Sequence, residues 1–153
     1  MPILVKNLSE FKQMEGQELP PSEWLTVTQE MINSFADATL DFQWIHTDAE
    51  RATKESPFKA PIAHGFLSLS LIPKLMADSI RIQSVKMGIN YGVNKVRFPH
   101  HVPAASRVRL KNKITKVESY AENGAKITWH GVIEIEGVEK PACVAEFVSL
   151  SFE

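Results

Sequence analysis

The chain has 153 residues, of which 44% are hydrophobic and 23% charged, a composition typical of one globular domain with a sizeable core. Its formal net charge of −1 gives no overall field that would attract nucleic acid or an anionic membrane. We find no signal-peptide pattern and no run of about 20 apolar residues that could span a membrane, so we expect a cytoplasmic protein. The single cysteine, Cys143, excludes an internal disulfide and a cysteine metal cluster, and we interpret it as a small strand residue.

Helical patterns dominate the first half of the chain. Residues 7–14 predict a short amphipathic helix, which the two prolines of QELPPSEW end. A second helix is expected from about Thr28 to Ala38, with the Thr28 hydroxyl capping its N-terminus. Residues 41–46 then form a predicted loop, and Thr47 and Glu50 match a capping box that would begin another helix.

A third helix is predicted over residues 65–78. It is apolar almost all round and should therefore be buried, with Phe66, Leu67 and Leu69 on its first turns. Pro73 lies inside this range and should bend the helix, because proline removes one main-chain hydrogen bond.

From Val85 onward the apolar residues alternate with polar ones, which indicates strands with one dry and one wet face. Strand candidates are VKMGINYGVNKVRF, SRVRLKNKITKV, AKITWHGVIEIEG and CVAEFVSLSF, and Gly88 and Gly92 in the first permit a bulge or a close approach of backbones. Helices first and strands afterwards is the pattern of an α+β domain. We find no repeat or linker and expect one domain over residues 1–153, a curved antiparallel sheet around the buried helix.

Asp41 and His46 are the best candidates for proton transfer. Alone, Asp41 is most simply a turn-capping residue and His46 a structural or surface histidine. Together, five residues apart across a short loop, they could share a cleft and hold one water molecule between a carboxylate and an imidazole. Burial would raise the pKa of the aspartate, and the pKa of a histidine already lies near neutrality, as acid–base catalysis requires.

Gly65 stands at the N-terminus of the apolar helix, where unpaired N–H groups could stabilise an oxyanion. A role in close packing is equally compatible with a glycine there. His64 could be a third catalytic group, although an orienting or packing role is favoured. His100 and His101 lie in a proline-flanked turn, and no spacing predicts a metal site.

The segments FADATLDFQWIHTDAERA and SPFKAPIAHGFLSLSLIPKL together resemble the MaoC-like dehydratase family, which includes the (R)-specific enoyl-CoA hydratases, and within it the NodN-like branch. The hydratase motif of that family runs aspartate, any residue, asparagine, proline, aliphatic and histidine, with a small residue six positions later. The matching residues are Asp41, Ile45, His46 and Ala52. Three positions differ, because Gln43 replaces the asparagine, Trp44 the proline, and Leu40 a glycine found in many members.

The resemblance implies a hotdog fold, an antiparallel β-sheet wrapped around a long central α-helix, usually dimerised with acyl-CoA near the interface. It implies reversible hydration of a trans-2-enoyl thioester to a (3R)-hydroxyacyl thioester. This reaction needs no metal or redox cofactor, and coenzyme A is part of the substrate. Asp41 and His46 would be catalytic. Gly65 would polarise the thioester carbonyl. Gln43 would position the loop, and Gln43 and His64 are the further substrate-binding candidates.

Two alternatives remain open from the sequence. One is an acyl-CoA thioesterase of the same fold, and the other is a noncatalytic acyl-thioester-binding protein, for which the departures at Leu40, Gln43 and Trp44 leave room. In either case we expect a homodimer or a higher homo-oligomer, because one hotdog subunit exposes a sheet edge and apolar surface. Phe66, Leu67 and Leu69 are the expected wall of an acyl tunnel. Lys95 and Arg97 are either phosphate ligands or the solvated face of a strand.

Overall fold

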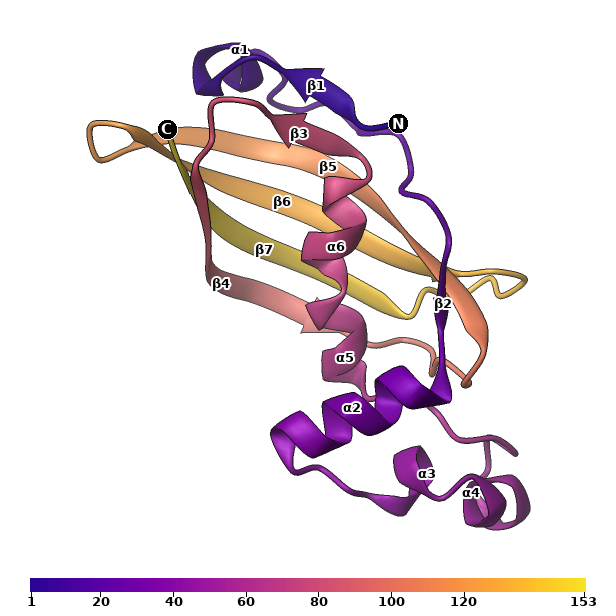
Figure 1. Ribbon diagram of the computed structural model, residues 1–153. Coiled ribbons are helices and arrows are strands. Elements are labelled where there is room, and N and C mark those ends of the chain that lie inside the picture. Colours follow the sequence, from indigo (N-terminus) through magenta and orange to yellow (C-terminus); the bar gives the residue numbers. More distant parts are fainter.

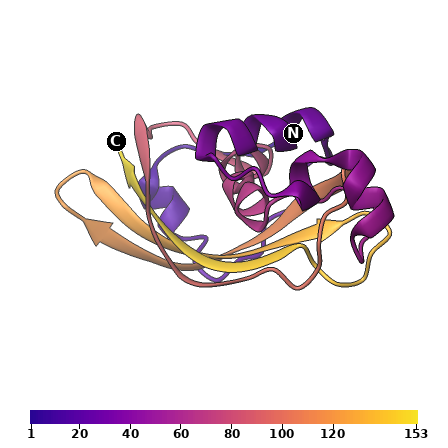
Figure 2. The same cartoon turned by 90° about the horizontal axis from the view of Figure 1, so that it is seen from below.

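The computed structural model describes residues 1–153 as one antiparallel five-stranded sheet with helices packed on one face (Figure 1). The strand order is β2-β5-β6-β7-β4, and Figure 2 shows the sheet curving around the helices. Its strands are β2 (Leu25–Val27), β4 (Met87–Arg97), β5 (Ser106–Tyr120), β6 (Gly124–Ile135) and β7 (Cys143–Phe152). A separate parallel pair joins β1 (Ile3–Val5) to β3 (Ile80–Ile82). The expected α+β hotdog architecture is confirmed.

Six short helices cover the inner face or extend beyond it (Figure 1). They are α1 (Leu8–Lys12), α2 (Gln29–Thr39), α3 (Trp44–Thr47), α4 (Ala49–Glu55), α5 (Gly65–Ser70) and α6 (Ile72–Ala77). None has the length and apolar content that crossing a bilayer would require. Helix α2 begins where its sequence predicts, because the Thr28 hydroxyl accepts a hydrogen bond from the Met31 N–H at 3.1 Å.

The core lies between the inner face of the sheet and the helices. Val108, Leu110 and Ile114 of β5 are fully buried, as the alternating pattern predicts. Their partners on β6 are also buried, and they are Ile135, Ile133 and Trp129. Strand β4 carries register shifts on both sides of the segment around Gly92, so of the two alternatives considered there, the bulge is the one observed.

The predicted helix over residues 65–78 consists of two helices, α5 and α6, which meet at Leu71. Pro73 lies in the first turn of α6, where a missing N–H leaves no helical hydrogen bond unmade. The interruption therefore falls where proline predicts it, whereas a single continuous helix was wrong. All-round burial was also wrong, since Phe66 is 68% exposed while Leu67 and Leu75 are buried.

The segment after α2 differs from its prediction in two ways. Residues Trp44–Thr47 form the short helix α3, so the loop is shorter than residues 41–46. The capping box was wrong, because the Asp48 carboxylate, and not the Thr47 hydroxyl, accepts the Arg51 N–H that begins α4. The Thr47 hydroxyl instead donates to the carbonyl oxygens of Phe42 and Gln43, since α3 brings these within reach.

Candidate active site

His46 is buried near the end of α3, and a hydrogen bond of its imidazole ring fixes its orientation. Its Nδ1 lies 2.7 Å from the carbonyl oxygen of Ile62, and since a carbonyl only accepts, Nδ1 carries the proton. The Ile62 N–H in turn donates to the Ile45 carbonyl oxygen at 3.0 Å, which ties the two segments together. The Nε2 atom of His46 makes no hydrogen bond within the chain and is not fully buried, so it presents a lone pair to a water or a substrate.

Burial lowers the pKa of His46 below its ordinary value of 6.5. The hydrogen bond to Ile62 and the nearby Asp41 carboxylate oppose this decrease, while His64 adds to it. The lowered pKa leaves the imidazole neutral near pH 7, which is the state in which Nε2 can accept a proton.

Gln29 is a supporting residue that the sequence did not reveal. Its side-chain Nε2 donates to the main-chain oxygen of His46 at 2.7 Å and to Asn33 Oδ1 at 2.9 Å. Helix α2 therefore holds the backbone of His46, while the Ile62 carbonyl holds its ring. No local motif predicts this role, because Gln29 lies 17 residues from His46.

Asp41 lies on the loop before α3, and its side chain is 53% exposed. Its Oδ1 accepts the N–H of Gln43 at 3.3 Å, so the turn-closing role of Asp41 is present. The burial expected for the Asp41 carboxylate is therefore not observed. One carboxylate oxygen of Asp41 and one ring nitrogen from each of His46 and His64 nevertheless lie within 4.8 Å of one another.

His64 joins this pair from the residue before α5. Its ring stacks on His46, with 3.9 Å between ring centroids and 23° between planes. Its Nε2 lies 3.1 Å from the main-chain oxygen of Asp41.

Gly65 is the first residue of α5, and its N–H has no main-chain partner. A Cβ atom at this position would lie 2.9 Å from the Phe98 ring, so the close-packing interpretation also holds. Phe98 belongs to the site for this reason, and it also meets Phe66 edge to face. Its role could not be read from the sequence because it follows β4, far along the chain.

Gln43 acts through its main chain. It is the N-cap residue of α3, its carbonyl oxygen accepts the His46 N–H at 3.0 Å, and its N–H donates to Asp41. Its side chain makes no hydrogen bond within the chain. The other candidates lie outside this cluster: His100 stacks on His101, and burial raises the pKa of the Cys143 thiol to about 11, as expected of a structural cysteine.

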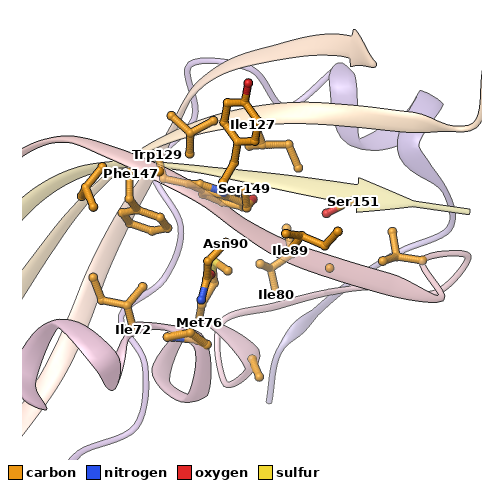
Figure 3. A pocket seen from close by; sticks show the side chains of 18 of the residues that line it. Ile72, Met76, Ile80, Ile89, Asn90, Ile127, Trp129, Phe147, Ser149 and Ser151 are labelled. Atoms are coloured by element: carbon orange, nitrogen blue, oxygen red, sulfur yellow. Dashed lines mark hydrogen bonds between the residues drawn. The ribbon is translucent and has the colours of Figure 1, made fainter. Parts of the chain in front are cut away.

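A cavity of about 660 Å³ lies between α5, α6 and the sheet (Figure 3). Helix residues Leu69, Ile72 and Met76 line one side, and Trp129 and Phe147 line the sheet side. The helix residues follow the spacing of one helical face. Of the expected tunnel wall only Leu69 lines this cavity, because Phe66 packs on Phe98 and Leu67 turns toward α2.

The model of the MaoC like domain family matches residues 10–135. The chain belongs to this family. It is 45% identical over 143 residues to 3-hydroxyacyl-thioester dehydratase Z of Mycobacterium tuberculosis, with 94% of each chain covered. It is 40% identical over 145 residues to Nodulation protein N of Rhizobium leguminosarum bv. viciae, with 94% of this chain and 90% of the relative covered.

Solved structures agree with the MaoC-like hotdog fold. The R-hydratase PhaJ1 from Pseudomonas aeruginosa has a TM-score of 0.72 at 22% identity, covering 97% of this chain and 88% of its own. A MaoC-like dehydratase from Rhodospirillum rubrum has a TM-score of 0.71 at 17% identity, covering 91% and 92%. At these identities the likeness shows the shared fold.

Proposed function

We propose that this MaoC-like chain is a hydro-lyase that reversibly adds water to a trans-2-enoyl thioester and forms a (3R)-hydroxyacyl thioester. The observation that carries the proposal is the unpaired Nε2 of a neutral His46 beside the Asp41 carboxylate and the unpaired Gly65 N–H. A relative of 45% identity named as a 3-hydroxyacyl-thioester dehydratase supports it.

Gly65 supplies the first requirement of the reaction, a site for negative charge. Attack of water at C3 moves electrons onto the thioester oxygen and forms an enolate. An N–H held at the start of α5 would donate to that oxygen, an interaction worth about 3 to 4 kcal/mol in comparable sites. Phe98 packs closely on the Cα of Gly65.

His46 and Asp41 supply the proton transfers. The water donates one hydrogen to His46 Nε2 and the other to the Asp41 carboxylate. As the water oxygen bonds to C3, its proton passes to Nε2, and the resulting imidazolium is stabilised by the Ile62 carbonyl and the Asp41 charge. Nε2 then returns the proton to C2, which restores the neutral histidine and completes the addition. No metal or redox cofactor takes part in this sequence.

The acyl chain would occupy the cavity beneath α5 and α6. Leu69 lies four residues after Gly65, a distance of about 6 Å along a helix, so the cavity starts one turn beyond the thioester. Its volume of about 660 Å³ falls within the usual range for ligand pockets and leaves room for more than a four-carbon acyl group. Lys95 and Arg97 form no ion pair with an acidic side chain and are candidates for the phosphates of the carrier.

A second copy of the chain is the proposed partner at β4. This strand has 11 residues and pairs only with β7, which leaves the main-chain groups of its other edge open. Met87, Ile89, Tyr91 and Val93 on it are apolar and exposed. Pairing of β4 with β4 of the second copy would cover both features, and light scattering coupled to size-exclusion chromatography would measure the expected dimer mass.

The decisive experiment is incubation with crotonyl-CoA and with a longer enoyl-CoA, following loss of the enoyl absorbance and the configuration of the product. Asp41→Asn and His46→Ala should each lower turnover by about 100-fold or more while remaining folded. His130→Ala, at an exposed histidine of β6, is the matched control and should keep full turnover. Thiol release would indicate a thioesterase, and binding without turnover a noncatalytic protein.

A further inference from the structure

We propose that His64 is the positioning residue of the catalytic pair, donating its Nε2–H to the backbone of Asp41 while its ring holds His46 in place. The inference rests on the hydratase function proposed above. It assigns His64 no contact with substrate and no proton transfer. Two independent features of its surroundings carry the assignment.

The first feature is the packing of the imidazole. The ring is only 4% exposed and lies between Phe35 and His46, with centroid distances of 4.9 Å and 3.9 Å. Phe35 comes from α2 and His46 from α3, so His64 fills the space between these two helices. The stacked face prevents His46 from tilting, while the Nδ1 bond to Ile62 prevents its rotation. Together the two contacts fix the direction of His46 Nε2.

The second feature is the hydrogen bonding of the two ring nitrogens of His64. Its Nδ1 is fully buried and has no hydrogen-bond partner. A proton on Nδ1 would be an unsatisfied buried donor, whereas a proton on Nε2 meets the Asp41 carbonyl oxygen at 3.1 Å. The Nε2–H tautomer is therefore favoured over the Nδ1–H tautomer.

This tautomer matters because Asp41 has few other anchors. Its side chain is 53% exposed, and apart from His64 it is held by the 3.3 Å contact with the N–H of Gln43. Losing the His64 contact would free the loop that keeps the carboxylate near His46. A displacement of about 1 Å in such a geometry costs on the order of 100-fold in rate.

Two variants separate the two features. His64→Phe keeps a flat ring against His46 but removes the donor to Asp41, and His64→Gln keeps a side-chain N–H near the position of Nε2 but removes the ring. We expect His64→Phe to lower kcat by about 10- to 100-fold with KM changed less than about threefold, since substrate contacts remain. His64→Gln should recover part of that kcat, and both variants should show cooperative melting.

A purely structural role would lower the melting temperature without this split between kcat and KM. Unchanged kcat in the folded His64→Phe variant would overturn the proposal, and so would a Gln variant no better than Phe. Long-range ¹H–¹⁵N spectra of the wild type test it without any substrate. The expected tautomers are Nε2–H for His64 and Nδ1–H for His46, and an Nδ1 proton on His64 would contradict the assignment even if the hydratase reaction itself were absent.

Discussion

The Nδ1 atom of His46 lies 2.7 Å from the carbonyl oxygen of Ile62, which joins α3 to the segment that leads into α5. A main-chain acceptor cannot be lost by side-chain substitution, so this contact holds the tautomer of His46 regardless of the residue at position 62. It leaves Nε2 as the only ring atom free for chemistry.

The pH dependence of kcat/KM should report His46. Because burial lowers its pKa, the neutral base persists to pH values below 6.5, and activity should fall only as the pH decreases through that lower pKa. The acid limb of kcat/KM for crotonyl-CoA should therefore have its midpoint below pH 6.5. His101→Gln is the control, since burial also lowers the pKa of His101 and its replacement should leave the limb in place.

The same lowered pKa has a consequence for stability. Below pH 6.5 the unfolded chain binds a proton at this histidine more readily than the folded chain, so the free energy of unfolding should decrease as the pH falls from 6.5 to the folded pKa. In His46→Gln this part of the pH dependence should disappear. Urea unfolding at several pH values measures it, and an unchanged slope in the variant would contradict the assignment.

Gly65→Ala should disturb the site through Phe98. The new Cβ would lie 2.9 Å from the Phe98 ring, so the ring must shift, with an expected loss of about 1 to 3 kcal/mol in the free energy of unfolding. Turnover should decrease as the oxyanion donor moves. Phe98→Leu gives the added methyl group room, so Gly65→Ala made in that background should cost less than in the wild type. Equal costs in both backgrounds would show that Phe98 is not the obstacle.

Met76→Trp should shorten the acceptable acyl chain. Met76 lines the cavity two turns beyond Leu69, so a larger side chain there would exclude long tails and spare short ones. We expect kcat/KM for a long enoyl-CoA to decrease by about tenfold or more relative to crotonyl-CoA. Lys74→Trp places the same side chain on the exposed side of α6 and should leave the ratio unchanged. A fall in both substrates for Met76→Trp would argue against the cavity as acyl site.

Leu40→Gly should stabilise the chain. Leu40 ends α2 with a φ of 63°, in the left-handed region that costs a non-glycine residue about 1 kcal/mol or more. Its side chain is 76% exposed, so little packing is lost with it. The free energy of unfolding should rise by about 0.5 to 1 kcal/mol. Leu40→Ala keeps the left-handed strain and should give no comparable gain.

Local patterns in the sequence were sufficient for several parts of the fold. The Thr28 cap and the apolar stripe of α2 lie within a few residues of each other, and the alternation in β5 and β6 identifies the buried face of each strand. These predictions succeeded because each depends on one segment and its periodicity. The candidate pair Asp41 and His46 was also visible from spacing and from the resemblance to the MaoC-like family.

Only the tertiary structure decided how these residues are held. Strands β1, β2 and β3 have three residues each, too few for a periodic signal, and their partners lie far along the chain. The contacts of His46 with Gln29, Ile62 and His64 join positions 16 to 18 residues apart, so their formation depends on the path of the chain. The sequence determined which groups were present, and the packing of α2, α3 and α5 determined which of their atoms remained free to react.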